Sequence, residues 1–210
     1  MARQRDLQHL ASDLRRLEAL LRRTAPSKAA DSIGADGIRI LNLACGECHE
    51  SGVLTRVFAG GPRAGTAKPD PPTVELVGID VRAPELARAR QRDLSSHRRT
   101  FCYIDADAAR LNRHSEAAGE FDLVFMRHQN FWNGPETWKS IFSKGLDQLS
   151  PGGRLIITSY FLHEHRLAVE AVRNLGATLL KSEDHREARI LDPKLGKRVD
   201  GHVAVFERPE

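Results

Sequence analysis

The sequence predicts a doubly wound α/β domain, in which a mostly parallel sheet carries helices on both faces, preceded by one amphipathic N-terminal helix. Two observations predict this fold. From residue 38 onward, short apolar runs suited to buried strands alternate with helical segments. The first of these runs ends in a loop of small residues that leads into a helix, as in many ligand-binding α/β proteins.

The N-terminal helix is predicted by leucines spaced three and four residues apart. Leu7, Leu10, Leu14, Leu17 and Leu21 form one apolar stripe, with charged residues between them, on a helix over residues 5–23. Proline prevents the helix from continuing past residue 26. We therefore expect residues 1–35 to be a basic amphipathic helix with its linker, and residues 36–210 to be the α/β domain.

The elements of the domain follow in order along the chain. The strands are expected at residues 38–43, 74–79, 101–104, 121–126, 154–160, 177–182 and 202–206. The helices are expected at residues 51–59, 84–93, 108–117, 135–149 and 164–175. Residues 60–73 contain four prolines and three glycines, which predicts a long inserted loop.

The basic charge is unevenly placed. Residues 1–28 hold seven basic and three acidic residues, which accounts for the whole net charge of +4. The α/β domain is therefore not a strongly basic nucleic-acid binder, although residues 82–99 hold six arginines and two acids. Solvated helix faces are the ordinary explanation of both basic segments.

Nothing in the sequence predicts export or a membrane span. No apolar run reaches the roughly 18–20 residues that a span needs, and the arginine-rich N-terminus has no apolar signal-peptide core. The three cysteines are Cys45, Cys48 and Cys102, and they are expected to be reduced thiols. A cytoplasmic protein without a membrane partner is the expectation.

The strongest functional signal lies where the first strand ends. Asn42, Ala44, Cys45 and Gly46 stand at its carboxyl end, where an open α/β sheet binds ligands if the strand order reverses there. Small residues let the backbone approach a ligand closely. Asp80 ends the second strand, and an acid at this place is suited to binding the two hydroxyls of a ribose.

Five segments over residues 38–160 now establish a resemblance. The ordered series "ILNLACGE", "LVGIDV", "IDADAARL", "FDLVFMRH" and "LSPGGRLIITSY" resembles the motifs of class I, Rossmann-like S-adenosylmethionine-dependent methyltransferases. The resemblance implies a seven-stranded sheet. It also implies an enzyme that moves a methyl group from S-adenosylmethionine to an oxygen or nitrogen nucleophile, with S-adenosylhomocysteine as the product.

The same resemblance assigns residues to the cofactor. Asp80 would bind the ribose, and Asp107 with the backbone of Ala108 would contact the adenine. The full set of implied cofactor residues is Asn42, Ala44, Cys45, Gly46, Asp80, Val81, Asp107, Ala108 and Arg127. The chain departs from the pattern at Asn42, where an acid is usual, and at two later glycine positions that hold Ala44 and Cys48.

Other ligands fit this first motif less well. Cys45, Cys48 and His49 have the spacing of a c-type haem attachment, but they follow a buried strand in a chain without an export signal. A zinc site would need a fourth ligand that is not paired nearby, so no metal is expected. A nicotinamide-binding domain would need the G-x-G-x-x-G pattern, which is missing.

The acceptor side of the site is less defined. His128 follows the fourth strand, where it is either a general base or a partly buried histidine that supports the loop. The aromatic residues near this edge are either core or a wall for the acceptor; they are Phe131, Trp132, Trp138 and Tyr160. His163 and His165 could reach the same edge but are expected at the surface.

Three functions therefore remain open. The first is methyl transfer to a small molecule. The second is methyl transfer to RNA, bound by the N-terminal helix and the arginines of residues 82–99. The third is a non-catalytic subunit that only binds S-adenosylmethionine or a partner, because a fold does not fix a function. The leucine stripe of the N-terminal helix could also join two copies of the chain.

Overall fold

The computed structural model describes residues 2–24, 37–59 and 73–208 of the chain. A seven-stranded sheet has the strand order β3-β2-β1-β4-β5-β9-β6. Its strands are β1 Ile38–Leu43, β2 Val74–Asp80, β3 Arg99–Asp105, β4 Phe121–Arg127, β5 Leu149–Ser159, β6 Thr178–Asp184 and β9 His202–Glu207. The β5–β9 and β9–β6 pairs are antiparallel, and the other pairs of this sheet are parallel. The predicted mostly parallel, seven-stranded sheet is confirmed.

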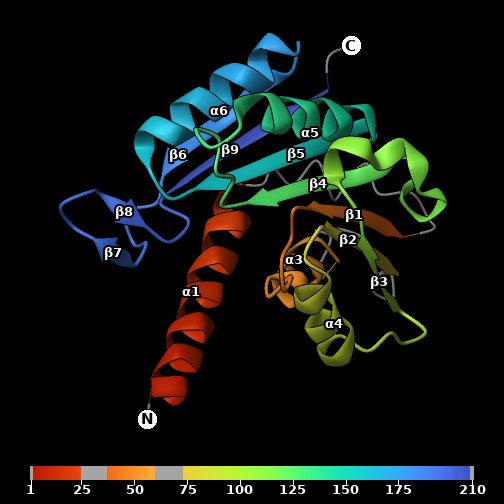
Figure 1. The fold of residues 1–210 in the computed structure, drawn as a ribbon, viewed down its shortest axis with the longest axis horizontal. Helices are drawn as coiled ribbons and strands as arrows, with labels where there is room; N and C mark the ends of the chain where they lie inside the picture. Colours follow the sequence, from red (N-terminus) through yellow and green to blue (C-terminus); the bar gives the residue numbers. More distant parts are fainter. Residues whose placement is uncertain (1, 25–36, 60–72, 209–210) are drawn as a thin grey trace, which may run out of the picture.

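Helices cover both faces of the sheet (Figure 1). One face carries α1 Ala2–Thr24, α3 Ser51–Ala59 and α4 Ala83–Arg92. The other face carries α5 Pro135–Asp147 and α6 Leu162–Asn174. Because successive side chains of a strand point to opposite faces, Ile40 belongs to one apolar core and Leu41 to the other. The doubly wound prediction is therefore also confirmed.

The strand order reverses beside β1. This strand pairs with β2 on one side and with β4 on the other, and both pairs are parallel. The chain reaches β4 only after it has built β2 and β3, so the connections leave a crevice beyond the carboxyl ends of β1 and β4. This topology places the loop after β1 and the residues after β4 at one site.

Helix α1 packs on the sheet through its second half only. Leu17, Leu20 and Leu21 have no exposed surface and share a core with Val205 of β9. By contrast, Leu7 is 60% exposed, and the N-terminal end of α1 extends away from the sheet (Figure 1). The helix is thus fixed to the α/β body at one end, and its leucine stripe continues past the contact.

Three expectations differ from the structure or fall outside it. The helix expected over residues 108–117 is two 3₁₀ segments, η1 Ala108–Arg113 and η2 Ser115–Ala117, because the backbone at Arg110 leaves helical geometry. A short hairpin of β7 Ile190–Asp192 and β8 Lys197–Arg198, which the sequence did not predict, stands before β9. The linker before residue 37 and the loop expected at residues 60–73 lie almost wholly outside the described residues.

None of the helices in the described residues combines the length and the apolar character that crossing a membrane requires.

Candidate active site

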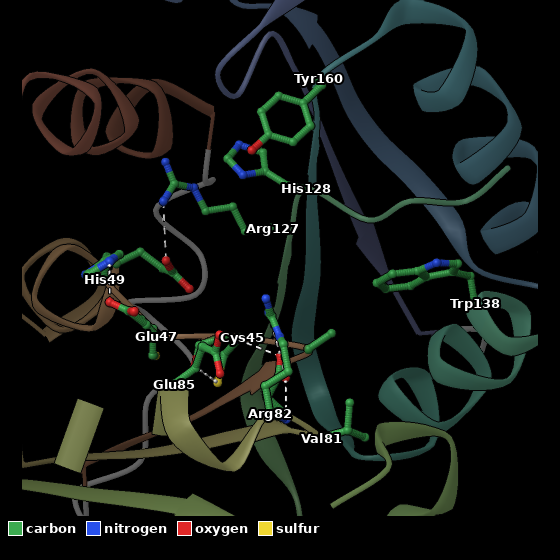
Figure 2. Close-up of a pocket in the computed structure, with 15 residues that line it drawn as sticks. Cys45, Glu47, His49, Val81, Arg82, Glu85, Arg127, His128, Trp138 and Tyr160 are labelled. Carbon is green, nitrogen blue, oxygen red and sulfur yellow. Dashed lines mark hydrogen bonds and ion pairs between the residues drawn. The ribbon is translucent and has the colours of Figure 1, made fainter. Parts of the chain in front are cut away.

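A cavity of about 570 Å³ lies at the carboxyl edge of the sheet, a size typical of small-molecule sites. Its walls come from the loop after β1, the ends of β2, β4 and β5, and helix α5 (Figure 2). The residues that line it are Ala44, Cys45, Gly46, Glu47, Cys48, His49, Glu50, Asp80, Val81, Arg82, Glu85, Arg127, His128, Trp138 and Tyr160.

The loop after β1 has a glycine-type backbone at three positions, of which one is a glycine. Ala44, Gly46 and Cys48 have φ values of 53°, 55° and 48°, which lie in the left-handed region. This region is strained for alanine and cysteine, at a cost of the order of 1 kcal/mol each. The Cys48 thiol is buried, and its sulfur accepts a hydrogen bond from Asn42 Nδ2 at 3.1 Å, so the interior takes up its bulk.

Arginines of α4 support this loop from outside. Arg92 donates to the backbone oxygens of Glu47 and Cys48 at 2.9 and 2.8 Å, and Arg88 pairs with the Glu47 carboxylate. These arginines belong to the basic segment at residues 82–99. Within the described structure they bind this protein's own loop, which leaves them less available to a phosphate backbone.

Asp80 sits at the end of β2 with its carboxylate fully engaged. Oδ1 accepts from the backbone N–H and the Nε of Arg82, both at 2.9 Å. Oδ2 accepts from the Gly46 N–H at 2.7 Å and from the Arg82 guanidinium at 3.2 Å. Burial would raise the pKa of Asp80, but these donors lower it, so the group is a carboxylate. Its roughly four acceptor sites are all occupied.

Arg127 and His128 extend from the end of β4 into the cavity, and both bind one buried carboxylate, Asp200 (Figure 2 labels the first two). Arg127 donates to the two oxygens of Asp200 at 3.0 and 2.6 Å. His128 Nε2 lies 2.9 Å from Asp200 Oδ1, which also accepts from the Thr158 hydroxyl at 2.8 Å. Burial opposes ionisation, but the charge of Arg127 and the hydrogen bond from His128 hold the pKa of Asp200 well below its usual value.

Tyr160 forms the wall beside His128. The two rings are stacked, with centroids 3.9 Å apart and an interplanar angle of 19°. Lys197 of the β7–β8 hairpin lies over the outer part of this wall, with its Nζ 4.8 Å from the Tyr160 ring centroid. Burial raises the pKa of Tyr160, so its phenol stays neutral. The imidazole therefore has one edge on Asp200 and one face on a neutral aromatic ring.

Backbone strain is concentrated at this cavity. Among the described residues, the non-glycine residues with left-handed backbone are Ala44, Cys48, His128 and Asp200. The first three line the cavity, and Asp200 holds the third in place. Strained conformations of this kind persist where the surroundings over-determine them, and they gather at functional sites.

Asp200 was not predicted, although its position has a simple physical origin. Since β9 is antiparallel, its first residues lie at the same edge of the sheet as the carboxyl ends of β4 and β5. An acid just before an antiparallel strand is thereby brought to the site. The Asp200-Gly201 pair, a turn signal directly before the last strand, was the available sequence clue.

The cofactor residues implied by the resemblance fall into two groups. The side chains or backbone of Ala44, Cys45, Gly46, Asp80, Val81 and Arg127 line the cavity. Asn42 does not line it, because it is fully buried and its amide donates to Glu50 Oε1 at 2.6 Å. Asp107 caps η1 by accepting from the Ala109 N–H, and neither it nor Ala108 is part of the cavity lining.

Of the four aromatic residues expected near this edge, two line the cavity and two do not. Trp138 and Tyr160 line the cavity. Phe131 is 5% exposed and stacks on Phe142 in the core, and Trp132 packs against Phe161 outside the cavity. The continuous wall expected from all four aromatic residues is therefore not formed by Phe131 and Trp132.

The two histidines after β5 lie in different surroundings. His163 lies near Trp132, with ring centroids 5.7 Å apart. The expectation of a surface position is wrong for His165, which is 3% exposed and contacts the hydroxyls of Ser159 and Ser182. Burial, with a further contribution from His202, lowers the pKa of His165 to about 4, so the ring is neutral.

Glu164 offers a pH-dependent stability test. It is 2% exposed, its Oε1 accepts from the Phe131 N–H at 3.1 Å, and burial raises its pKa to about 7. Because the folded state holds this proton more tightly than the unfolded state, stability falls as pH rises from about 4.5 through 7. We expect Glu164→Gln, which keeps the acceptor oxygen, to be about 1–3 kcal/mol more stable than the wild type at pH 8.

Thermal unfolding of both proteins at pH 5 and pH 8 tests this expectation. The difference should shrink at pH 5, where the carboxyl of the folded wild type is protonated. Shifts from other groups, including His165, are common to both proteins. A stability difference that is the same at both pH values would show that Glu164 does not titrate as described.

The strand order, the crevice beside β1 and the antiparallel β9 define the fold of class I S-adenosylmethionine-dependent methyltransferases. The chain is similar to the N-methyltransferase NodS from Bradyrhizobium japonicum WM9, with a TM-score of 0.63 and 16% identity over 95% of this chain and 98% of that one. It is similar to an rRNA methylase from Streptococcus thermophilus, with a TM-score of 0.59 and 15% identity over 88% and 93% of the two chains.

A third similar structure is fibrillarin from Aeropyrum pernix, in complex with natively bound S-adenosyl-L-methionine. Its TM-score is 0.59 and its identity 15%, over 90% of this chain and 73% of that one. No protein-family model and no curated protein matches the sequence. The predicted resemblance is thus confirmed at the level of the fold.

Proposed function

We propose that the protein is a methyltransferase that moves a methyl group from S-adenosylmethionine to an oxygen or nitrogen nucleophile of a small molecule. One observation carries this proposal. The strained residues Ala44, Cys48 and His128 line one cavity, at the reversal of strand order, together with a carboxylate at the end of β2.

The residues present fit S-adenosylmethionine. A side chain at position 46 would meet the Arg82 guanidinium, because a Cβ there would lie 2.6 Å from it, so glycine lets this guanidinium lie against the loop. The ribose hydroxyls would replace the exposed Arg82 guanidinium on Asp80, and the exposed side chain of Val81 offers an apolar surface for the adenine. When bound, S-adenosylmethionine would supply a methyl group on a sulfonium, whose sulfur would leave as the neutral thioether of S-adenosylhomocysteine.

His128 is placed to remove a proton from that nucleophile. The Asp200 carboxylate only accepts hydrogen bonds, so its 2.9 Å contact places the imidazole proton on Nε2 and leaves Nδ1 as the basic nitrogen. The backbone N–H of Asp200 also approaches Nε2, at 3.3 Å, but the carboxylate contact is the shorter. Arg127 and Thr158 orient Asp200, and the stacked Tyr160 fixes the ring plane.

A small acceptor is favoured over RNA by the basic residues. Arg82, Arg88 and Arg92 of the 82–99 segment bind Asp80, Glu47 and the loop backbone. On α1, Arg22 pairs with Glu18 and Arg23 with Glu183. These charges are already compensated within the fold, whereas RNA binding depends on cations that meet phosphates.

Calorimetry with S-adenosylhomocysteine tests the cofactor site through two substitutions with opposite effects. Asp80→Ala should weaken binding by about 1.5–3 kcal/mol, the range for hydrogen bonds to a charged group. Arg82→Gln should strengthen binding about two- to fivefold, because the ribose must displace a guanidinium that is 56% exposed and held by an ion pair of modest strength.

The fold of each variant is checked by circular dichroism. If the wild-type protein does not bind S-adenosylhomocysteine or S-adenosylmethionine, the proposed function is wrong. If it binds and both variants bind equally well, the ribose site does not include Asp80.

A further inference from the structure

Glu50 is a buried carboxylate that faces the cavity. It is 3% exposed, yet it is among the residues that line the cavity, directly before helix α3. One oxygen, Oε1, accepts from the Asn42 amide at 2.6 Å. The other, Oε2, lies 3.4 Å from the nearest Arg127 nitrogen, which is longer than an ordinary charge-assisted hydrogen bond.

The charges at this end of the cavity do not balance. Arg127 makes its short contacts, at 3.0 and 2.6 Å, with Asp200 and approaches Glu50 only at 3.4 Å. The two buried carboxylates thus share one guanidinium, and among the described residues no other cation pairs with Glu50. A buried carboxylate with open acceptor sites is costly unless a cation or further donors meet it.

Asn42 holds the Glu50 carboxylate in its position beside the cavity. Its side chain is fully buried and donates to both Glu50 and the Cys48 thiol, so it positions the carboxylate instead of reaching the cavity itself. Its own oxygen has no partner among the described residues. The strand end therefore holds a neutral amide, and the negative charge lies eight positions further along the chain, at Glu50.

We infer that Glu50 binds a primary ammonium group, and that it takes the amino-acid end of the cofactor in place of the acid that position 42 lacks. This inference rests on the proposed function. An ammonium group has three donors, which match the open acceptor sites of Glu50, and its charge compensates the second carboxylate. Asn42 is a positioning residue, and Glu50 is the binding residue.

The test compares two ligands that differ in the ammonium group. S-adenosylhomocysteine carries the amino-acid end, and 5′-methylthioadenosine lacks it. Glu50→Gln keeps the shape of the side chain and removes its charge, so it should lower the affinity for S-adenosylhomocysteine about 10- to 100-fold. The affinity for 5′-methylthioadenosine should change less than about threefold, which also shows that the variant is folded.

A second variant returns the acid to the strand end. In Asn42→Asp combined with Glu50→Gln, the amide and the carboxylate exchange places while their hydrogen bond is kept. Because position 42 is fully buried and does not line the cavity, the affinity for S-adenosylhomocysteine should stay as low as in Glu50→Gln. A double variant that binds 5′-methylthioadenosine normally and regains most of the affinity for S-adenosylhomocysteine would overturn the assignment of Glu50 as the binding residue.

Other outcomes separate this inference from the proposed function. Equal binding of S-adenosylhomocysteine by the wild type and Glu50→Gln overturns the ammonium site and leaves the proposed function intact. Loss of both ligands in Glu50→Gln overturns it as well, because it shows a structural role. Failure of the wild type to bind either ligand overturns the proposed function, and the inference with it.

Discussion

Replacing His128 with alanine is expected to lower kcat about 10²- to 10⁴-fold, the usual contribution of a general base. The imidazole is held by Asp200 at Nε2 and stacked on Tyr160, so its other nitrogen is presented by a rigid support. Affinity for S-adenosylhomocysteine should change little. The measurement uses any acceptor that makes the wild-type protein release S-adenosylhomocysteine from S-adenosylmethionine.

The pH dependence of kcat distinguishes a base from a positioning residue. With a base, the wild-type rate should fall as the solution becomes acidic and the imidazole takes up a proton, and the alanine variant should lose this dependence. Much of a methyl transfer can also come from orientation of the two reactants. In that case the substitution should mainly raise KM, with the same pH profile in both proteins, and His128 would not be the base.

Tyr160→Phe is a matched control for this experiment. It keeps the ring that stacks on His128 and removes only the hydroxyl. Its kcat should stay within a few-fold of the wild-type value if the phenol supports the imidazole by stacking alone. A loss as large as that of His128→Ala would transfer the acid–base role to the phenol.

The sheet could be predicted from the sequence because its determinants are local. Residues 76–79 of β2 and 123–126 of β4 carry no charged or polar side chain, and such runs indicate strands that are buried on both faces. Asp80 could be placed because parallel strands end at one edge. The 3₁₀ geometry of Ala108–Arg113 could not be predicted from the sequence. Its residues have good helix propensity, and only the backbone conformation at Arg110 interrupts the helix.

Of the pair formed by His128 and Asp200, only the position of His128 could be predicted from the sequence. His128 follows a parallel strand, so its edge of the sheet was known from order alone. Its partner Asp200 is 72 residues away and arrives through the antiparallel β9, whose direction no local pattern specifies. Glu50 was overlooked for a different reason: the resemblance draws attention to the strand end at Asn42, and only packing shows that the charge sits beside it.

Helix α1 is expected to contribute several kcal/mol to folding, most of it from the buried leucines of its second half. Leu20→Ala should cost about 2–5 kcal/mol, because it opens a cavity in a core where the leucine has no exposed surface. Leu7→Ala, the same change on the same stripe, should stay within about 0.5 kcal/mol, because Leu7 is 60% exposed. Both substitutions favour helix formation equally, so the difference between them measures packing alone.

Urea unfolding of the two variants measures this difference, and removal of residues 1–24 extends it. Burial of Leu17, Leu20 and Leu21 is worth about 1.5–3 kcal/mol for each side chain, which together approaches the 5–15 kcal/mol that hold a typical domain folded. The shortened protein should therefore unfold or aggregate near room temperature. If Leu20→Ala is as stable as Leu7→Ala, and the shortened protein keeps the full melting temperature, α1 is a free arm. A free basic arm would in turn favour RNA as the acceptor, which a salt-dependent RNA shift with and without residues 1–24 would detect.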